Sequence, residues 1–479
     1  MSSSFDLEAL RRLPLAEAVM RLLNFGLADD LLDDVFAQHR GRSYKDVIRF
    51  PEFIHLLADG LFEQRHSGHQ IFQRAIDEGQ VEVTLQALYG KLRRVPIGLS
   101  LGLFDTVGAR VRMVAPAVVA QPLPASLQSF WALAFDGKKL KHVLHRLKPL
   151  RGLKGNVFGG KLLVVQDMAT EQAVAIEAVA DGETADNPLV PGVVNRVRAL
   201  GTPWQRLWVA DRAFCEYGSL PLLAEHGDHF VVRFSAGCKF HAETGVPTRS
   251  GVDKDGRDYT EEWGWLGNKA VRCRKITVTR PGQQPFAVVT NLEDADQYLA
   301  DDLLALYRRR WGIETMFQQV VQTFDLRHLI GGTPPGTIFQ AVLCFLVYNV
   351  ILTIRDYIAV ASDREPAKIS TKTLFDDVAD ELTGLLKLVE VENIEEMFRA
   401  NPLEDAAALR QHLQQILANV WCNRWQKAGT RKQPAQRKAR AYLCGGHSSV
   451  DKIIRGQHHE ISFDNLPDNI KPQEAAKDV

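Results

Sequence analysis

The spacing of apolar residues changes along the chain and divides it into segments of different type. In residues 1–120 apolar positions recur three and four residues apart, as in FDLEALRRLPLAEAVMRLL, which predicts mostly helices. Residues 121–235 favour short strands alternating with helices, and residues 236–296 combine turn formers with alternating strands. Helical spacing returns in residues 297–370 and again in residues 371–479. We therefore expect an α/β region that is interrupted by a β-rich insertion and flanked by helical N- and C-terminal regions.

The α/β region has a definite order of elements, which is three strands, a helix, a strand, a helix and a strand. Its first strand, in SFWALAFDGKKL, is expected to end at Asp136 with a turn at Gly137. The apolar segment RLWVADRAF is typical of a central strand. Pairing the first three strands as a meander and adding the last two in parallel gives a mixed five-stranded sheet. This order resembles the ribonuclease-H-like fold, and the predicted fold class is therefore α/β with several domains.

The longest apolar run, from Ile338 to Ile354, also carries Gln340, Asn349 and Thr353. This length is marginal for a bilayer span, so we expect a buried core helix and no membrane partner. The N-terminus has no apolar core of the signal-peptide type.

Composition adds little beyond a broad class. A chain of 479 residues with 46% hydrophobic and 24% charged residues is expected to be globular with several domains. Formal net charge is zero, so attraction to nucleic acid would have to come from local basic segments. Six cysteines without a C-x-x-C pair favour a reduced, cytoplasmic protein.

Three carboxylates fall where the predicted elements would bring them together. Asp136 and Asp211 follow neighbouring strands of the expected sheet, and Glu314 lies on the helix after the insertion. Converging carboxylates repel one another, and a divalent cation with hard oxygen ligands relieves that repulsion. Each residue also has a simpler explanation. Asp136 could belong to a turn, Asp211 could cap a helix, and Glu314 could pair with Arg310.

The stretch LYRRRWGIETMF gives this helix a polar face. At about 100° per residue, Tyr307, Arg310 and Glu314 lie within roughly 60° of one another. A planar guanidinium and a phenol beside a carboxylate suit a phosphate backbone next to a metal ion. Trp311 and Ile313 lie off this face and are expected to pack into the core.

These residues resemble the motifs of bacterial insertion-sequence transposases with a DDE triad. The third motif of that family has the form Y-x2-R-x3-E-x6-K, and the first three motif positions match here in spacing. AFDGKKL and VADRAF resemble the first two motifs, and the resemblance covers about residues 126–355. The final Lys of the motif is replaced by Val321, which puts one DNA contact of the family in question.

The resemblance implies a cut-and-paste DNA transposase with Asp136, Asp211 and Glu314 as catalytic residues and as ligands of two Mg²⁺ or Mn²⁺ ions. Its partners would be double-stranded DNA, both the inverted-repeat ends of the transposon and the target, and a second copy of the enzyme in a homodimer. Within the insertion, Trp263 or Trp265 could stack on an extruded base, or could simply pack in turns.

Further DNA contacts are predicted from local charge. Tyr307 and Arg310 would hold phosphate, and Arg212 could contact DNA or form a surface ion pair. Lys138 and Lys139 begin a basic stretch beside Asp136, which favours DNA contact. A second basic segment, which is either a DNA contact or a solvated tail, includes Arg431, Lys432, Arg437 and Lys438. The N-terminal helices could recognise the DNA ends, although no motif identifies a reading helix.

Two other functions remain open at this stage. A related metal-dependent nuclease, such as a resolvase, would cut DNA without strand transfer. A domesticated or defective relative would bind DNA without catalysis, and the replacement at Val321 leaves room for that alternative.

Overall fold

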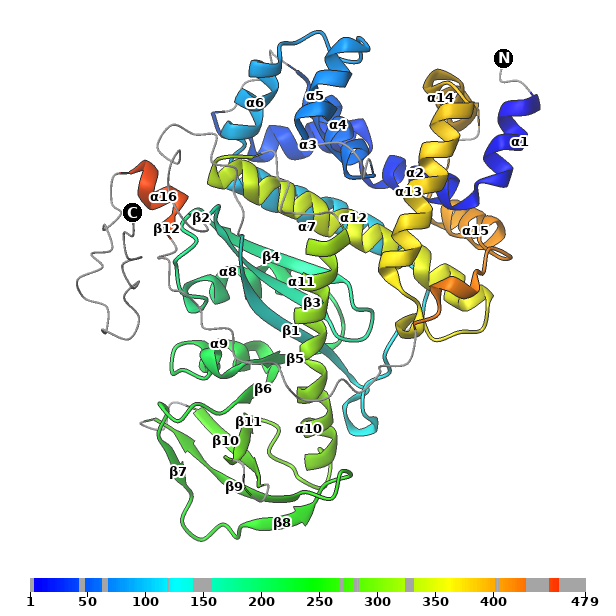
Figure 1. The fold of residues 1–479 in the computed structure, drawn as a ribbon. Coiled ribbons are helices and arrows are strands. Elements are labelled where there is room, and N and C mark those ends of the chain that lie inside the picture. The colour runs from blue at the N-terminus through cyan, green and yellow to red at the C-terminus, as the bar shows by residue number, and fades with distance from the viewer. Residues whose placement is uncertain are drawn as a thin grey trace, which may run out of the picture.

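The structure of the protein is a computed structural model. It describes residues 4–42, 48–62, 68–118, 120–140, 157–267, 271–279, 282, 284–323, 331–400, 403, 405–427 and 448–455. Figure 1 shows a layer of helices above a central twisted sheet, and a β-rich part at the opposite end of the molecule. The helices α10 (Ala300–Arg309) and α11 (Trp311–Thr323) run beside the sheet from the β-rich part toward the helical layer.

The central sheet has the predicted order of strands. The strands before the insertion that form it are β1 (Phe130–Lys139), β3 (Lys161–Asp167), β4 (Ala173–Val179), β5 (Gln205–Ala210) and β6 (His229–Arg233). They lie in the order β4-β3-β1-β5-β6. Strands β1, β3 and β4 pair antiparallel as a meander, whereas β5 and β6 are added parallel to β1. The prediction of a ribonuclease-H-like mixed sheet is therefore confirmed.

The two faces of this sheet belong to two different hydrophobic cores. Successive side chains of a strand point to opposite faces. On β1, Ala132 and Ala134 lie in the larger core, while Leu133 and Phe135 lie in the smaller one. The helices α8 (Val190–Ala199) and α9 (Ser219–Ala224) cover the smaller core. The helices α7 (Ile97–Val114), α11 and α12 (Pro334–Ala361) contact the sheet on the other side.

The long apolar run forms α12 (Pro334–Ala361), which extends beyond the run at both ends. The helix is buried over most of its length. By length and composition α12 could cross a membrane, but its apolar window is completely covered by other parts of the protein. This burial is typical of a core helix, as the sequence predicts.

The N-terminal and C-terminal helices pack around α12. The first group is α1 (Ser4–Arg12), α2 (Pro14–Gly26), α3 (Asp29–His39), α4 (Phe50–Phe62), α5 (Gly68–Asp77), α6 (Leu85–Arg94) and α7 (Ile97–Val114). The second group is α13 (Thr371–Leu388), α14 (Val391–Ala400) and α15 (Ala406–Ile416). One carboxylate oxygen of Glu381 on α13 accepts hydrogen bonds from the backbone N–H groups of Leu15 and Ala16 at 2.8 and 3.2 Å. Chain segments that are far apart in sequence therefore share one helical layer.

The insertion continues the central sheet. Its strands are β7 (Phe240–Ala242), β8 (Arg249–Val252), β9 (Asp258–Leu266), β10 (Val271–Val278) and β11 (Phe286–Thr290). Strand β11 pairs antiparallel with β6, and β10 and β9 follow it, so that ten strands form one sheet. A short two-stranded sheet of β2 (Val157–Phe158) and β12 (Ser448–Ser449) with α16 (Val450–Ile454) lies at the other side of the domain.

Candidate active site

Asp136 lies inside strand β1 rather than at its end. The pairing of β1 with β5 stops at Ala134, whereas its pairing with β3 continues to Lys139. The predictions that the strand ends at Asp136 and turns at Gly137 are therefore wrong, because β1 stays paired with β3 after its pairing with β5 has ended. Gly137 serves a different purpose, since a Cβ there would lie 1.8 Å from a carboxylate oxygen of Asp186. Beyond Ala134, β1 is no longer paired with β5, and Asp136 lies on this unpaired side of the strand.

Asp211 directly follows β5, as predicted. Its Oδ1 accepts a hydrogen bond from the backbone N–H of Arg212 at 2.7 Å and so caps a short 3-10 helix. The hydroxyl of Tyr307 donates to the same oxygen at 3.4 Å. The capping role and the contact with the polar helix face are therefore both present.

Arg310 connects the other two carboxylates. The helix tightens at this residue, because Arg310 N–H bonds to the carbonyl of Tyr307 and the N–H of Ile313 bonds to the carbonyl of Arg310, both at 3.1 Å. Arg310 Nη2 donates to Glu314 Oε1 at 3.2 Å, and Nη1 lies 3.9 Å from Asp136 Oδ2. The guanidinium is buried between two carboxylates that come from separate parts of the chain.

The surroundings of Asp136 disfavour its ionised form. Burial raises the pKa of Asp136 to about 6, helped by the nearby carboxylates of Asp186 and Glu314, although the Gly137 N–H and Arg310 oppose the shift. Burial also raises the pKa of Tyr307 to about 12, so the phenol keeps its proton as a hydrogen-bond donor. Within the described part of the chain, no three His, Cys, Asp or Glu side chains already form a metal-binding group.

A cavity of about 410 Å³ opens on these residues. Asp211, Tyr307, Arg310 and Glu314 form one side of it. The other lining residues are Arg233, Arg257, Val278, Gln284, Phe286, Leu304, Arg308 and Trp311. The cavity therefore lies between the sheet edge, the α10–α11 helices and the insertion.

Several of these lining residues escaped prediction from the sequence. Arg233 is the last residue of the buried strand β6, and Asp211 follows the parallel neighbouring strand β5. This position at the strand end could have identified Arg233 as a site residue from the sequence. Phe286 and Arg257 belong to the insertion, where no local pattern indicates proximity to the carboxylates. The prediction that Trp311 packs into the core is wrong. Its side chain is 62% exposed rather than packed in the core, because the first residue of α11 faces the cavity mouth. Ile313 is buried, as expected.

Other predicted contact residues lie around the site or apart from it. Arg212 is exposed beside Asp211 and has no ion-pair partner among the described residues. Lys138 and Lys139 place their ammonium groups 5.2 Å from the ring centre of Phe317 and 4.9 Å from that of Phe158. These contacts leave both lysines partly exposed on β1.

The two insertion tryptophans are on one face of β9, separated only by Gly264. The indole N–H of Trp263 donates to the carbonyl of Glu293 at 2.9 Å, and Trp263 lines a different pocket from the carboxylates. Trp265 is half-buried and pairs with Arg272 of β10. Neither residue lines the cavity that contains Asp211.

The last motif position is structural. Val321 packs against the larger hydrophobic core, and the side chain of neighbouring Gln319 accepts a hydrogen bond from Tyr348 at 2.6 Å. The basic residues Arg431, Lys432, Arg437 and Lys438 lie outside the described residues.

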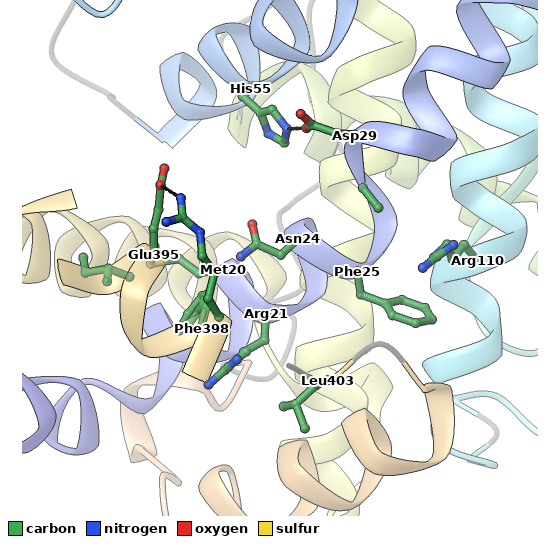
Figure 2. Close-up of a pocket in the computed structure, with 13 residues that line it drawn as sticks. Met20, Arg21, Asn24, Phe25, Asp29, His55, Arg110, Glu395, Phe398 and Leu403 are labelled. Atoms are coloured by element: carbon green, nitrogen blue, oxygen red, sulfur yellow. Dashed lines mark hydrogen bonds and ion pairs between the residues drawn. The ribbon is translucent and has the colours of Figure 1, made fainter. Parts of the chain in front are cut away.

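A separate cleft of about 650 Å³ lies in the helical layer among α2, α3, α4, α7 and α14. Figure 2 shows its lining, in which Arg21 lies over the ring of Phe398 at 3.8 Å and His55 faces Asp29 at 3.2 Å. Acids and bases line it together, and it shares no lining residue with the carboxylate cavity. Its lining does not repeat the arrangement of carboxylates, arginine and tyrosine found in the carboxylate cavity.

The class of this protein is defined by a ribonuclease-H-like sheet in which Asp136 lies in β1 just beyond its pairing with β5, and Asp211 directly follows β5. Residues 130–350 match the family model of the transposase DDE domain. The chain therefore contains a transposase DDE domain, which spans β1 to the middle of α12. No curated protein sequence matches the chain.

Among solved structures, the chain is similar to the piggyBac transposase in its synaptic complex with hairpin DNA. The identity is 12%, the TM-score is 0.38, and the similarity covers 84% of this chain and 86% of that chain. A likeness at this level carries no conclusion about the site.

Proposed function

We propose that this protein is a DNA transposase that cuts DNA at transposon ends and joins the freed ends to a target. Asp136, Asp211 and Glu314 are its catalytic residues. The proposal is carried by the contacts of two neighbouring helix residues with all three carboxylates: Tyr307 bonds to Asp211, and Arg310 lies between Glu314 and Asp136. The transposase DDE domain over residues 130–350 supports the same reading.

Tyr307 and Arg310 would position a backbone phosphate. Among the described residues, Nε and Nη1 of Arg310 are buried without a hydrogen-bond partner. Burial without a partner costs about 1–3 kcal/mol per group, and phosphate oxygens would supply the missing acceptors. The phenol of Tyr307 adds a neutral donor beside Asp211.

The residues present fit a divalent metal. Carboxylate oxygens are the hard donors that Mg²⁺ and Mn²⁺ prefer, and a bound cation would offset the cost that burial places on the charged form of Asp136. Asp136, Asp211 and Glu314 would hold up to two ions, which would supply activation of the attacking oxygen and stabilisation of the leaving oxygen. Arg310 would meanwhile hold the phosphate and partly neutralise Asp136 and Glu314.

The partners follow from this activity. Double-stranded DNA with inverted repeats would be the substrate, a second DNA molecule the target, and a homodimer would hold two ends together. Residues 1–120 are proposed to recognise the ends, and the protein would act in the cytoplasm on chromosomal DNA. Cut-and-paste transfer through hydrolysis and strand joining is the proposed reaction sequence.

The test uses DNA that flanks the reading frame on both sides, with Mg²⁺ and a target plasmid. The unaltered protein should cut the ends and join them to the plasmid, and Asp211→Asn should lose both activities by at least about 1,000-fold. Asp296→Asn, an exposed acid of the insertion, is the matched control and should stay active. Equal activity of Asp211→Asn and the unaltered protein would discard the assignment.

Two further outcomes separate the rival functions. Cutting without joining would identify a metal-dependent nuclease. Binding of the ends without cutting, by the unaltered protein, would identify a non-catalytic relative.

A further inference from the structure

The stretch LYRRRWGIETMF contains three consecutive arginines, and each reaches a different part of the molecule. Arg310 lies between two of the carboxylates. Arg308 donates from Nη1 to a carboxylate oxygen of Asp255, in the turn between β8 and β9, at 2.6 Å. Neighbouring helix residues project about 100° apart, so adjacent arginines meet separate surroundings. Arg309, the last residue of α10, does not line the carboxylate cavity, so the chemistry of that cavity does not account for it.

Arg309 is held by backbone carbonyls of the sheet region. Its Nη1 donates to the carbonyl of Pro122 at 2.6 Å, and its Nη2 donates to the carbonyl of Gln121 at 2.7 Å. Nη2 also lies 3.5 Å from the carbonyl oxygen of Met168, directly after β3. The planar guanidinium therefore spans two chain segments, the one that leads into β1 and the turn between β3 and β4.

These two segments are fixed to the strand that carries the first carboxylate. The backbone N–H of Gln121 donates to the carbonyl of Ala169 at 3.0 Å, which joins the segments to each other. The N–H of Met168 donates to the carbonyl of Ala132 in β1, also at 3.0 Å. Arg309 thus connects the end of α10 to the frame of β1.

The place of Arg309 matters because the helix breaks at the next residue. Helix α10 ends at Arg309, and α11 follows after the tightened turn at Arg310. Further along α11, Gln319 accepts a hydrogen bond from Tyr348 of α12 at 2.6 Å. Arg310 and Glu314 therefore lie between two anchored points, one on the sheet and one on the core helix.

The environment of Arg309 is unfavourable for a charge. Burial lowers the pKa of Arg309, and the charge of Glu171 opposes the shift. Its Nε is also buried without a hydrogen-bond partner among the described residues. A half-buried cation whose hydrogen-bond partners are neutral carbonyls loses water without the full attraction of an ion pair. This favours a role in geometry over one in stability.

We propose that Arg309 is a positioning residue, which fixes the break between α10 and α11 to the frame of β1. Arg310 and Glu314 are thereby held against Asp136. The effect on the reaction rests on the proposed function, whereas the hold on the helix break does not. A lysine in this position keeps the charge but cannot reproduce the planar fork across two carbonyls. The break would then move, and a shift of about 1 Å at reacting groups can slow a reaction about 100-fold.

The first measurement is amide hydrogen exchange in EDTA, which needs no catalysis. Arg309→Lys should speed exchange at the N–H groups of Arg310 and Ile313 about 10-fold or more, because these groups form the hydrogen bonds of the tightened turn. Exchange within α12 should stay within about 2-fold, since only the break is expected to loosen. Arg399→Lys, at an exposed arginine whose ion pair lies within its own helix, is the matched control.

The second measurement is the rate of cutting of end-bearing DNA with Mg²⁺, at a temperature where circular dichroism shows that all variants are folded. Arg309→Lys should lower kcat about 10- to 100-fold and change KM less than about 2-fold, because it removes an alignment needed in the transition state rather than a contact with DNA. Combined with Arg310→Lys it should cause little further loss, since Arg309 acts through Arg310. Independent effects of the two residues would instead multiply.

Unchanged exchange at the break, unchanged kcat in folded Arg309→Lys, or losses that multiply in the double variant would overturn the proposal. Arg309→Met removes the charge as well and should exceed the effect of lysine in both measurements; where it does not fold, the lysine variant decides. Absence of cutting by the unaltered protein would discard the proposed function, and hydrogen exchange would still decide whether Arg309 holds the break. Conversely, failure of this proposal would leave the cutting test with Asp211→Asn unaffected.

Discussion

Replacing Asp136 by Asn should make the protein more stable in the absence of divalent cations. Burial shifts the pKa of Asp136 from 3.8 to about 6, so above pH 6 the folded chain holds an ionised group that its surroundings disfavour. A shift of this size corresponds to about 3 kcal/mol, and the side chain is only 26% exposed. Asn keeps the shape and removes the charge. The free energy of unfolding should therefore rise by about 2–3 kcal/mol near pH 7.

The pH dependence gives the sign of the effect independently. Between pH 6 and pH 3.8 the folded protein takes up the proton of Asp136 before the unfolded chain does, so the cost of ionisation disappears as the pH falls. At pH 4 the variant and the unaltered protein should differ by less than about 1 kcal/mol. If residues 130–350 unfold as one unit, the gain near pH 7 is a rise in Tm of about 4–6 °C.

Thermal unfolding in EDTA at several pH values, with Asp258→Asn as an exposed control, measures this effect. Adding Mg²⁺ should then stabilise the unaltered protein by about 1.4 kcal/mol at ten times its Kd, and stabilise Asp136→Asn less. A stability that falls or stays the same near pH 7 on replacing Asp136 would refute the reasoning, because it would mean that the carboxylate is well solvated or well paired.

Three further substitutions test the surroundings of the site. Arg310→Lys should reduce cutting by at least about 100-fold in a cleavage assay, because a lysine cannot reproduce the planar fork between Asp136 and Glu314. Trp311→Ala should change the free energy of unfolding by less than about 0.5 kcal/mol in chemical denaturation, since the ring is exposed, but should weaken DNA binding if a base stacks on it. Val321→Lys, which restores the family motif, should lower the free energy of unfolding by about 1 kcal/mol, because the position packs against the core; an unchanged denaturation midpoint would contradict this.

Local patterns were sufficient to place the strands and the helix that carry the carboxylates. The strand order came from the resemblance of the element order to the ribonuclease-H-like fold. The alternation of residues in the five strands and the switch to helical spacing after residue 297 are short-range patterns, which can be recognised from neighbouring residues alone. The spacing of Tyr307, Arg310 and Glu314 similarly places them on one helix face, and the hydrogen bonds of the structure agree with that placement.

The features that the sequence does not reveal all depend on contacts between distant segments. Strand β1 continues past Asp136 because β3 remains its partner after β5 has ended, and no local signal in AFDGKKL distinguishes this from a turn. Trp311 is exposed because the insertion stands opposite α11 and forms a cavity there instead of a packed interface.

The pairing of β11 with β6 has the largest consequence among these long-range contacts. It makes the insertion an extension of the central sheet, and therefore fixes Phe286 and the β10 side chains relative to Asp211 through backbone hydrogen bonds rather than through a flexible linker. A rigid connection of this kind holds side chains to the accuracy that phosphoryl transfer needs. In the proposed function, the insertion would therefore shape the path of DNA at the carboxylates, even though most of its residues lie far from them in sequence.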